Sequence, residues 1–559
     1  MAARVDTRPG LRTVGRLVAD ALAAAGVEWA FTVPGESFLG LLDALPRAGI
    51  RVVATRHEGG ASFMAEAAAQ FTGRPAACLG TRAVGAANLA IGIHTARQNS
   101  SPVVALVGQV ERGLRGREAF QEIDQVASIG RLAKWAAELD DPSTVAATLG
   151  DGLRAMVDGR PGPVLMSLPE DVLDEPLDDE PPDIRPPVPA PPDALAVQAV
   201  VDMLEAARRP VILAGGGVLR AGATDMLVTL AEVLSVPVMA AWRRPDVFPN
   251  DHRLYLGMTG YGAARTVLPR LLEADALLVL GCRLNEPTTF GYRVPGRDAR
   301  WAHVDLEPRS AGTAGLAAAD TALACDALAF LELALSAARE APSTGRHLPS
   351  ALVADREAYL QASTVDGAEQ WKGSGVHPGR VVATLQRVLP RDAVLTTDAG
   401  NFGLWPARSY RFTQPRTFLG PTSGAMGYGL PAAIAASLCA PDRAVVALCG
   451  DGGFAMTMSE LETAVRLGTR PVVLVFDNRR YGTIAMHQER EGRELMAIDL
   501  GPIDFSTLAR ACGAQGGRIA RDKEFEPALR DALEADRPAL IHLELDRRWV
   551  SPDHPASGD

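Results

Sequence analysis

An aspartate and an asparagine stand where two apolar segments of the chain end. Asp451 lies in a Gly-Asp-Gly turn after the apolar run 444–448, and Asn478 follows the apolar run 471–476. In an open parallel sheet, ligands bind beyond the carboxyl ends of the strands. Mg²⁺ prefers oxygen ligands, is usually held by one or two carboxylates, and takes further ligands from water and substrate phosphates. The two side chains therefore indicate a site for a hard cation beside a phosphate.

The elements that must position these side chains are a strand, a tight glycine turn and a helix. After the turn, apolar residues recur at helical spacing from Met456 to Leu467. Gly452 and Gly453 would let the backbone approach a phosphate closely, and the start of the helix would favour its negative charge. A glycine turn with an aspartate also joins strand to helix in many α/β domains, so the tripeptide alone does not distinguish a cation site from a structural turn.

Three stretches together resemble the thiamine diphosphate enzymes, and within them the acetohydroxyacid (acetolactate) synthase branch. They are the Gly-Asp-Gly turn with an asparagine fewer than thirty residues later, the segment 423–433 (SGAMGYGLPAA) and the segment 56–66 (RHEGGASFMAE). The resemblance runs over nearly the whole chain. It implies an α/β fold of three doubly wound parallel-sheet domains, namely an N-terminal pyrimidine-binding domain, a central nucleotide-type domain and a C-terminal diphosphate-binding domain.

The division of the chain into domains follows from its length and from shifts in composition. A chain of 559 residues is too long for one core and suits three domains. Proline and acidic residues concentrate between the first and second domains, where we expect an extended linker without a regular element. We expect the first and third domains to share a topology. The expected ranges are 8–173 for the N-terminal domain, 174–193 for the first linker, 194–335 for the central domain, 336–372 for the second linker and 373–550 for the C-terminal domain.

Composition excludes several classes of partner. The formal net charge is -11, and the sequence has no dense run of Lys or Arg, so neither nucleic acid nor a membrane surface is an expected partner. The N-terminus lacks an apolar signal core, and no run of 18 apolar residues occurs. The cysteines are scattered without a Cys-x-x-Cys pair, which indicates reduced, buried thiols and a cytoplasmic location. They are Cys78, Cys282, Cys325, Cys439, Cys449 and Cys512.

The resemblance implies thiamine diphosphate and Mg²⁺ as cofactors and gives roles to individual residues. Glu58 would be the catalytic carboxylate that hydrogen-bonds the aminopyrimidine ring, although a carboxylate at a helix start is also explained by the helix dipole. Met426 would hold the cofactor bent, and Phe120 and Gln121 would line the site. Asp451, Asn478 and the Arg480 carbonyl would ligate the metal. Further cofactor contacts would come from Pro34, Gly35, Gly400, Asn401, Phe402, Gly424, Gly452, Gly453, Tyr481, Gly482, Thr483 and Ile484.

In this family the glutamate-bearing domain of one subunit faces the diphosphate-bearing domain of another. The resemblance therefore implies a homodimer as the smallest active unit, and a homotetramer is common.

The middle of the chain indicates a strand and a glycine turn at 211–217, without the spacing of the dinucleotide fingerprint. In the synthase branch this domain binds FAD, whereas in related decarboxylases it is empty, so FAD stays open. The matching positions are Gly215, Gly216, Gly257, Met258, Thr259, Arg283 and Asp305.

The substrate channel departs from the synthase pattern. Pro287 stands where an arginine should hold a second carboxylate, and His487 replaces a tryptophan. Glu170 replaces a lysine, and Glu36 a glycine. Together with Glu111 these changes make an anionic acceptor less favourable. Nearby positive charge could offset them, from Arg112, Arg115 or Arg117.

Three functions remain open at this point. The first is a carboligase that decarboxylates pyruvate or a related 2-oxo acid and transfers the acyl-anion equivalent to a carbonyl acceptor, which could be an aldehyde or a sugar-like ketone. The second is a simple 2-oxo acid decarboxylase of the benzoylformate or pyruvate decarboxylase type, which needs a proton donor. Lone histidines are the candidates for that donor, and a structural role is open for each: His57, His94, His377 and His487. The third is a non-catalytic family member. Such a protein would be free to lose Glu58 or a metal ligand, but this sequence keeps Glu58 and the expected metal ligands.

Overall fold

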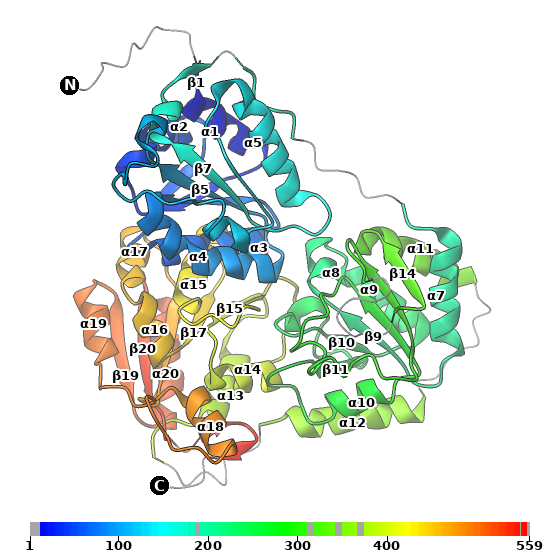
Figure 1. Cartoon of the computed structure of the whole chain (residues 1–559). Coiled ribbons are helices and arrows are strands. Elements are labelled where there is room, and N and C mark those ends of the chain that lie inside the picture. Colours follow the sequence, from blue (N-terminus) through cyan, green and yellow to red (C-terminus); the bar gives the residue numbers. More distant parts are fainter. Residues whose placement is uncertain are drawn as a thin grey trace.

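The structure, a computed structural model, describes residues 12–177, 179–184, 191–309, 318–340, 349–365, 374–547 and 549–555. Three six-stranded sheets follow one another along this part of the chain, and every strand pair within them is parallel. Figure 1 shows them as three bodies, coloured blue to cyan, green, and yellow to red along the chain. The predicted α/β fold of three parallel-sheet domains is confirmed.

The N-terminal domain has the strand order β3-β2-β4-β5-β7-β6. Its central strand β5 is buried at every position, as a parallel strand covered on both faces must be. Its strands are β2 (Trp29–Thr32), β3 (Arg51–Ala54), β4 (Ala76–Thr81), β5 (Val103–Gln109), β6 (Trp135–Glu138) and β7 (Val164–Pro169). Its helices are α1 (Val14–Ala24), α2 (Leu39–Arg47), α3 (Glu58–Thr72), α4 (Arg82–Asn99), α5 (Pro142–Val157) and α6 (Glu170–Leu173).

A small strand pair extends this domain into the first predicted linker. Strand β1 (Arg12–Thr13) pairs antiparallel with β8 (Pro176–Leu177). This corrects the expectation that 174–193 holds no regular element. Proline is tolerated here because a two-stranded ribbon has free edges, where the missing N–H is not needed. Within that linker, residues 178 and 185–190 lie outside the described part of the chain.

The central domain has the strand order β11-β10-β9-β12-β13-β14, which is the order typical of dinucleotide-binding domains. Its strands are β9 (Pro210–Ala214), β10 (Val238–Ala240), β11 (Tyr255–Met258), β12 (Ala276–Leu280), β13 (Arg300–Asp305) and β14 (Thr321–Ala324). Its helices are α7 (Ala194–Ala206), α8 (Gly216–Arg220), α9 (Thr224–Leu234), α10 (Val267–Leu272) and α11 (Ala327–Glu340).

The second predicted linker contains a helix. Helix α12 (Ser350–Ser363) lies within 336–372, and its Leu352 and Tyr359 are buried in the core of the central domain. These two residues are spaced by two helical turns, so they share the face that the helix turns toward the sheet. Helix α11 also continues past residue 335.

The C-terminal domain has the strand order β16-β15-β17-β18-β20-β19, which repeats the order of the N-terminal domain and confirms their shared topology. Its strands are β15 (Val394–Thr397), β16 (Phe418–Leu419), β17 (Val445–Gly450), β18 (Val472–Asp477), β19 (Gln515–Ile519) and β20 (Ala539–Glu544), with the short pair β21 (Trp549–Ser551) and β22 (His554–Pro555). Its helices are α13 (Pro378–Val388), α14 (Leu404–Ser409), α15 (Gly429–Cys439), α16 (Asp451–Thr457), α17 (Glu460–Arg466), α18 (Gly482–Arg490), α19 (Phe505–Ala511) and α20 (Asp522–Glu534).

One hydrophobic core joins the first and third domains. Helices α3 and α4 pack between the N-terminal sheet and α15, and Phe63 meets Tyr428 edge to face at 5.5 Å between ring centroids (Figure 1). Within this core, Glu66 accepts hydrogen bonds from Asn99, Ser101 and the Tyr428 hydroxyl, at 2.8, 2.7 and 2.6 Å. Burial nevertheless raises the pKa of the Glu66 carboxyl above its ordinary value of 4.5.

Glu66 should make the stability of the fold depend on pH. Because its pKa is raised in the folded chain, its contribution is present in full below pH 4.5 and is lost as the pH rises above that value. Glu66→Gln removes the charge, so the thermal midpoint of the variant minus that of wild type should increase between pH 5 and pH 8. Each kcal/mol of free energy of unfolding corresponds to a difference of about 2–4 °C. A midpoint difference that is flat or falls with pH would contradict this.

All six cysteines are free; four of them are buried, as expected, whereas Cys439 and Cys512 are half-buried. Among the residues that the structure describes, no helix is long and apolar enough to cross a membrane.

Candidate active site

A cavity opens in the C-terminal domain where the strand order reverses, between β15 and β17. In sheets of this order the reversal is where ligands bind. The loops after both strands contribute, because the carboxyl ends of parallel strands meet at one edge. The lining residues are Pro378, Ala399, Gly400, Asn401, Phe402, Trp405, Gly424, Met426, Gly450, Asp451, Gly452, Gly453, Phe476, Asn478, Arg480, Tyr481, Gly482, Thr483, Ile484 and Leu545. Every metal or cofactor residue expected from this domain lies among them.

Two carboxylates approach each other at this cavity. Asp451 begins α16 and is 7% exposed. Burial and the neighbouring Asp477 raise the pKa of Asp451 to about 7. Asp477 itself accepts a 2.7 Å hydrogen bond from His542 Nε2, which helps to hold its pKa low. A cation beside Asp451 would offset both the burial and the like charge, so the donor set fits a hard cation.

The loop after β18 brings further oxygen atoms to the cavity. Asn478 lines the cavity, and its Oδ1 accepts a 3.2 Å hydrogen bond from the backbone N–H of Arg480. An amide oxygen and a main-chain carbonyl on the same short loop are ligand types that Mg²⁺ accepts.

The glycines of the turn leave no room for side chains. A Cβ on Gly452 would lie 2.7 Å from the Tyr481 ring, and one on Gly453 would lie 2.4 Å from Asp398 Oδ2. Both glycines line the cavity, so bare backbone borders it at the start of α16, where N–H groups suit a phosphate. Met426 lines the same cavity and is half-buried.

Asp398 is a buried acid that the sequence reasoning did not single out. It follows β15, and its Oδ1 accepts a 2.5 Å hydrogen bond from the N–H of Gly429 at the start of α15. Burial raises the pKa of Asp398 to about 7. The hydrogen bond from Gly429 to Asp398 fixes the loop that carries Met426 to the sheet edge. An acid directly after a predicted strand was a signal that could have found it.

Glu58 lies at the edge of the N-terminal sheet, as the first residue of α3. It is 8% exposed and accepts a 2.8 Å hydrogen bond from Asn88 Nδ2, a partner that sequence reasoning missed. The loop before it is tied to the C-terminal domain, since Glu460 accepts hydrogen bonds from the N–H groups of Arg56 and His57 at 3.1 and 3.0 Å. The His57 ring caps α3 by accepting from the Gly59 N–H.

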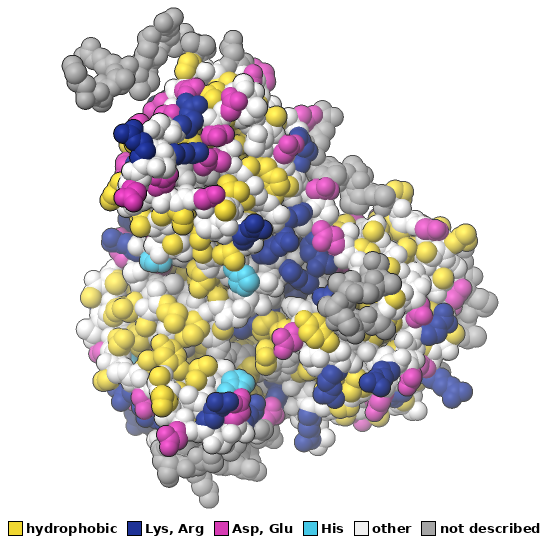
Figure 2. All heavy atoms as spheres, viewed as in Figure 1, with side chains coloured by type: hydrophobic (Ala, Val, Ile, Leu, Met, Phe, Trp, Pro, Cys, Tyr) yellow, Lys and Arg dark blue, Asp and Glu magenta, His cyan; other side chains and the backbone are white. Residues whose placement is uncertain are grey.

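The single chain does not bring the two halves of the expected site together. Glu58, Pro34, Gly35, Phe120 and Gln121 are absent from the lining of the C-terminal cavity. Phe120 is 71% exposed. Large hydrophobic side chains are also exposed on α4, α16 and α18, namely Val84, Ile91, Met456 and Ile484. Figure 2 shows hydrophobic side chains gathered over the N- and C-terminal domains.

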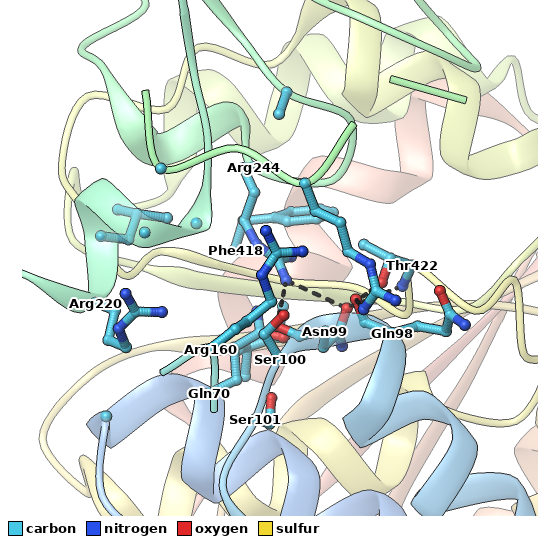
Figure 3. Close-up of a pocket in the computed structure, with 18 of the residues that line it drawn as sticks. Gln70, Gln98, Asn99, Ser100, Ser101, Arg160, Arg220, Arg244, Phe418 and Thr422 are labelled. Carbon is cyan, nitrogen blue, oxygen red and sulfur yellow. Dashed lines mark hydrogen bonds between the residues drawn. The ribbon is translucent and has the colours of Figure 1, made fainter. Parts of the chain in front are cut away.

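A second cavity lies between the domains, at the carboxyl edge of the central sheet. Strand order reverses there between β9 and β12, and the turns after these strands meet in a 2.7 Å hydrogen bond from the Gly217 N–H to the Gly281 carbonyl. Figure 3 shows Arg160, Arg220 and Arg244 around this space, which we call the arginine-rich cavity. Arg160 also pairs with Asp305 at the end of β13, at 2.8 Å.

Only three of the seven residues expected at an FAD site line the arginine-rich cavity. Gly216, Arg283 and Asp305 line the arginine-rich cavity, whereas Gly215, Gly257, Met258 and Thr259 do not. Met258 lines a smaller neighbouring cavity together with Gly400. Trp242 borders both spaces and therefore lies between them.

Fold and site define the class of protein: a three-domain α/β protein with a nucleotide-type middle domain and an acidic, glycine-rich cofactor cavity in its last domain. Family models for the thiamine pyrophosphate enzymes match all three domains. The N-terminal TPP binding domain matches residues 12–128, the central domain 197–333 and the C-terminal TPP binding domain 398–543.

Curated relatives match over almost the whole chain. A probable acetolactate synthase large subunit of Methanocaldococcus jannaschii is 32% identical, covering 96% of this chain and 93% of the relative. The acetolactate synthase large subunit of Corynebacterium glutamicum is 31% identical, covering 95% and 87%. A catabolic acetolactate synthase of Raoultella terrigena is 30% identical, covering 95% of each. The chain belongs to the thiamine pyrophosphate (thiamine diphosphate) enzyme family, and it is an enzyme of the acetolactate synthase type.

Proposed function

We propose that this enzyme is a carboligase that decarboxylates pyruvate or a related 2-oxo acid and transfers the acyl-anion equivalent to a carbonyl acceptor. The observation that carries the proposal is the pair of sheet edges described above: a buried glutamate at the N-terminal edge, and a cavity with Asp451 and Asn478 at the C-terminal edge. The free and mostly buried cysteines support a reducing, cytoplasmic location.

The C-terminal cavity would hold Mg²⁺ and the diphosphate of the cofactor. We propose Asp451, Asn478 and the Arg480 carbonyl as metal ligands, because each borders the cavity and offers oxygen. The bare backbone of Gly452 and Gly453 would take phosphate oxygens. When bound, thiamine diphosphate supplies the carbon nucleophile and the electron sink that decarboxylation needs.

Glu58 would hold a proton at the aminopyrimidine ring. A carboxylate suits this task because it can share a proton with a ring nitrogen through a hydrogen bond. Asn88 orients it by donating to Oε2, which leaves Oε1 for the cofactor. Because the loop carrying Glu58 is fixed by Glu460, the carboxylate is presented from a rigid edge.

We propose that two chains complete each active site, as a homodimer or a homotetramer. Glu58 and Asp451 belong to separate edges of one chain, and exposed hydrophobic side chains on α4, α16 and α18 support burial against a second copy. A C2 dimer would then pair the N-terminal edge of one copy with the C-terminal cavity of the other.

Mixed dimers test this arrangement. In dimers of Glu58→Gln and Asp451→Asn chains, one site carries both changes and the other carries neither. Co-expression should therefore recover about a quarter of wild-type activity by random pairing, although each variant alone is nearly inactive. Sites built within single chains would give no recovery, and that result would contradict the proposal.

Two of the histidines considered as proton donors for a simple decarboxylase are engaged within the fold. The rings of His57 and His377 each accept a hydrogen bond from a backbone N–H at a helix start, at 2.9 and 3.1 Å, so both act as helix caps. His94 and His487 are exposed in the single chain. A simple decarboxylase needs an acid aimed at the reacting carbon.

Decarboxylation assays test the function. Protein loaded with Mg²⁺ and thiamine diphosphate is offered 2-oxo acids with and without an aldehyde, and both carbon dioxide and products are followed. A carboligase gives hydroxyketones. Release of free aldehydes alone would establish the decarboxylase instead.

We further propose that FAD binds in the arginine-rich cavity with its ADP half at the arginines. The residues there fit a nucleotide, since arginines suit the pyrophosphate and Asp305, at the end of β13, suits a ribose. The flavin half would have to pass Trp242. Flavin fluorescence on titration with FAD, with ADP as competitor, tests the site. No binding of either nucleotide would overturn it.

A further inference from the structure

Three charged side chains form a cluster at the carboxyl edge of the N-terminal sheet, and none of them is among the residues expected to hold the cofactor. Arg82 lies between Glu36 and Glu170, with Nη1 3.2 Å from Glu36 Oε1 and Nη2 2.9 Å from Glu170 Oε2. The Arg82 side chain is 12% exposed, whereas those of Glu36 and Glu170 are 58% and 36% exposed. The two carboxylates therefore cover the guanidinium and face outward.

The cluster occupies the place where this sheet would bind a ligand. Strand order reverses between β2 and β4, and Glu36 and Arg82 follow these two strands. The equivalent reversal in the C-terminal domain, between β15 and β17, borders the cofactor cavity. The turns are packed closely, since a Cβ on Gly35 would lie 2.5 Å from Thr81 Cβ.

Arg82 is held in a strained backbone. Its φ is 40°, in the left-handed region where a side chain other than hydrogen costs energy. Such strain is typical of residues kept for their side chain at functional sites.

The cluster adjoins the expected reaction centre. Arg82 begins α4, and Asn88 on the same helix donates to Glu58. Gly85, one turn after Arg82, is close enough that a Cβ would lie 3.6 Å from Glu58 Oε1. The guanidinium carbon also stands 5.8 Å from the centre of the Phe120 ring. A substrate held near Glu58 and Phe120 would meet this cluster.

The outward face of the cluster is negative. One arginine stands against two glutamates, and neither carboxylate's second oxygen has a hydrogen-bond partner among the described residues. Of the three arginines that could have added positive charge, Arg117 is exposed and the other two are engaged elsewhere. Arg112 binds Asp171 and Glu175, and Arg115 binds Glu138.

We propose that Glu36, Arg82 and Glu170 select the acceptor: an uncharged carbonyl compound with a hydroxyl-bearing end, such as a hydroxyaldehyde, in preference to a second 2-oxo acid. Hydroxyl groups donate to the free carboxylate oxygens, whereas an acceptor carboxylate meets like charge. This inference rests on the proposed carboligase function. In the reaction the bond to the donor carboxylate breaks and CO2 leaves. The acyl carbon then bonds to the acceptor's carbonyl carbon, whose oxygen takes up a proton.

Glycolaldehyde and glyoxylate form a matched pair of acceptors, because they differ only in a hydroxymethyl or carboxylate end. Both are offered at equal concentration with pyruvate to the enzyme loaded with Mg²⁺ and thiamine diphosphate, and the ratio of the two products is measured. Wild type should favour the glycolaldehyde product by about tenfold or more, the effect of like charge at a recognition site. Glu36→Gln with Glu170→Gln should shift the ratio at least about tenfold toward glyoxylate, because Arg82 becomes free for a carboxylate.

The single variants Glu36→Gln and Glu170→Gln are measured in parallel and should shift the ratio partway. Glu175→Gln, which removes one of the two acidic partners of Arg112 and leaves Asp171 in place, should leave the ratio unchanged. A wild-type preference for glyoxylate, or an unchanged ratio in all the Glu36 and Glu170 variants, would overturn the inference alone. No CO2 from pyruvate in any assay would overturn the proposed carboligase reaction with this donor, and the inference would fall with it.

Discussion

Glu58→Gln should lower turnover by about 10²–10⁴-fold, the usual contribution of a positioned acid or base. Glutamine keeps the size of the side chain and can still accept the hydrogen bond from Asn88, so the fold and the loop should persist. It cannot share a proton with a ring nitrogen. Turnover of a 2-oxo acid and binding of thiamine diphosphate by calorimetry are measured side by side, and binding should change far less than turnover.

Asp43→Asn is the matched control, because it removes an exposed acid of the same domain that pairs with Arg47 on α2. It should leave turnover within about twofold of wild type, as substitutions away from special sites do. A Glu58→Gln enzyme that keeps more than a tenth of wild-type turnover would refute the role of Glu58.

Asp451→Asn should separate stability from cofactor binding. Burial and Asp477 raise the pKa of Asp451, so removing its charge should leave the metal-free protein as stable as wild type or more stable. Affinity for Mg²⁺ and thiamine diphosphate should fall by about 100-fold or more. Even the loss of a residue that only hydrogen-bonds a metal ligand lowers metal affinity by about 10–100-fold. Thermal midpoints with and without the cofactors measure both effects.

Asp442→Asn changes an exposed acid of the same domain and should keep the full rise in thermal midpoint on adding the cofactors. If Asp451→Asn showed the same rise, the metal site would have to lie elsewhere.

The sequence was sufficient for much of the fold and of one half of the site. Apolar runs marked the buried strands, and the residues at strand ends, such as Asp451 and Asn478, had to meet at one sheet edge. The structure places them around one cavity. Their roles as ligands stay predictions.

Contacts between distant residues could not be predicted in the same way. Arg82 and Glu170 meet only because β4 and β7 both flank β5 in the sheet. Glu460 binds the loop before Glu58 from another domain. Helix α12 was missed because its burial depends on a surface of the central domain, against which Leu352 and Tyr359 pack. Such pairs follow from tertiary packing, which local patterns do not encode.

The measurement that tests the central claim most directly is anaerobic incubation of the protein with pyruvate, Mg²⁺ and thiamine diphosphate, with and without glycolaldehyde. Carbon dioxide and all products are quantified, and Glu58→Gln serves as the control. A carboligase should release carbon dioxide in step with a hydroxyketone, and both should disappear in the Glu58→Gln enzyme. Acetaldehyde as the product under both conditions, or products that persist in Glu58→Gln, would contradict the account.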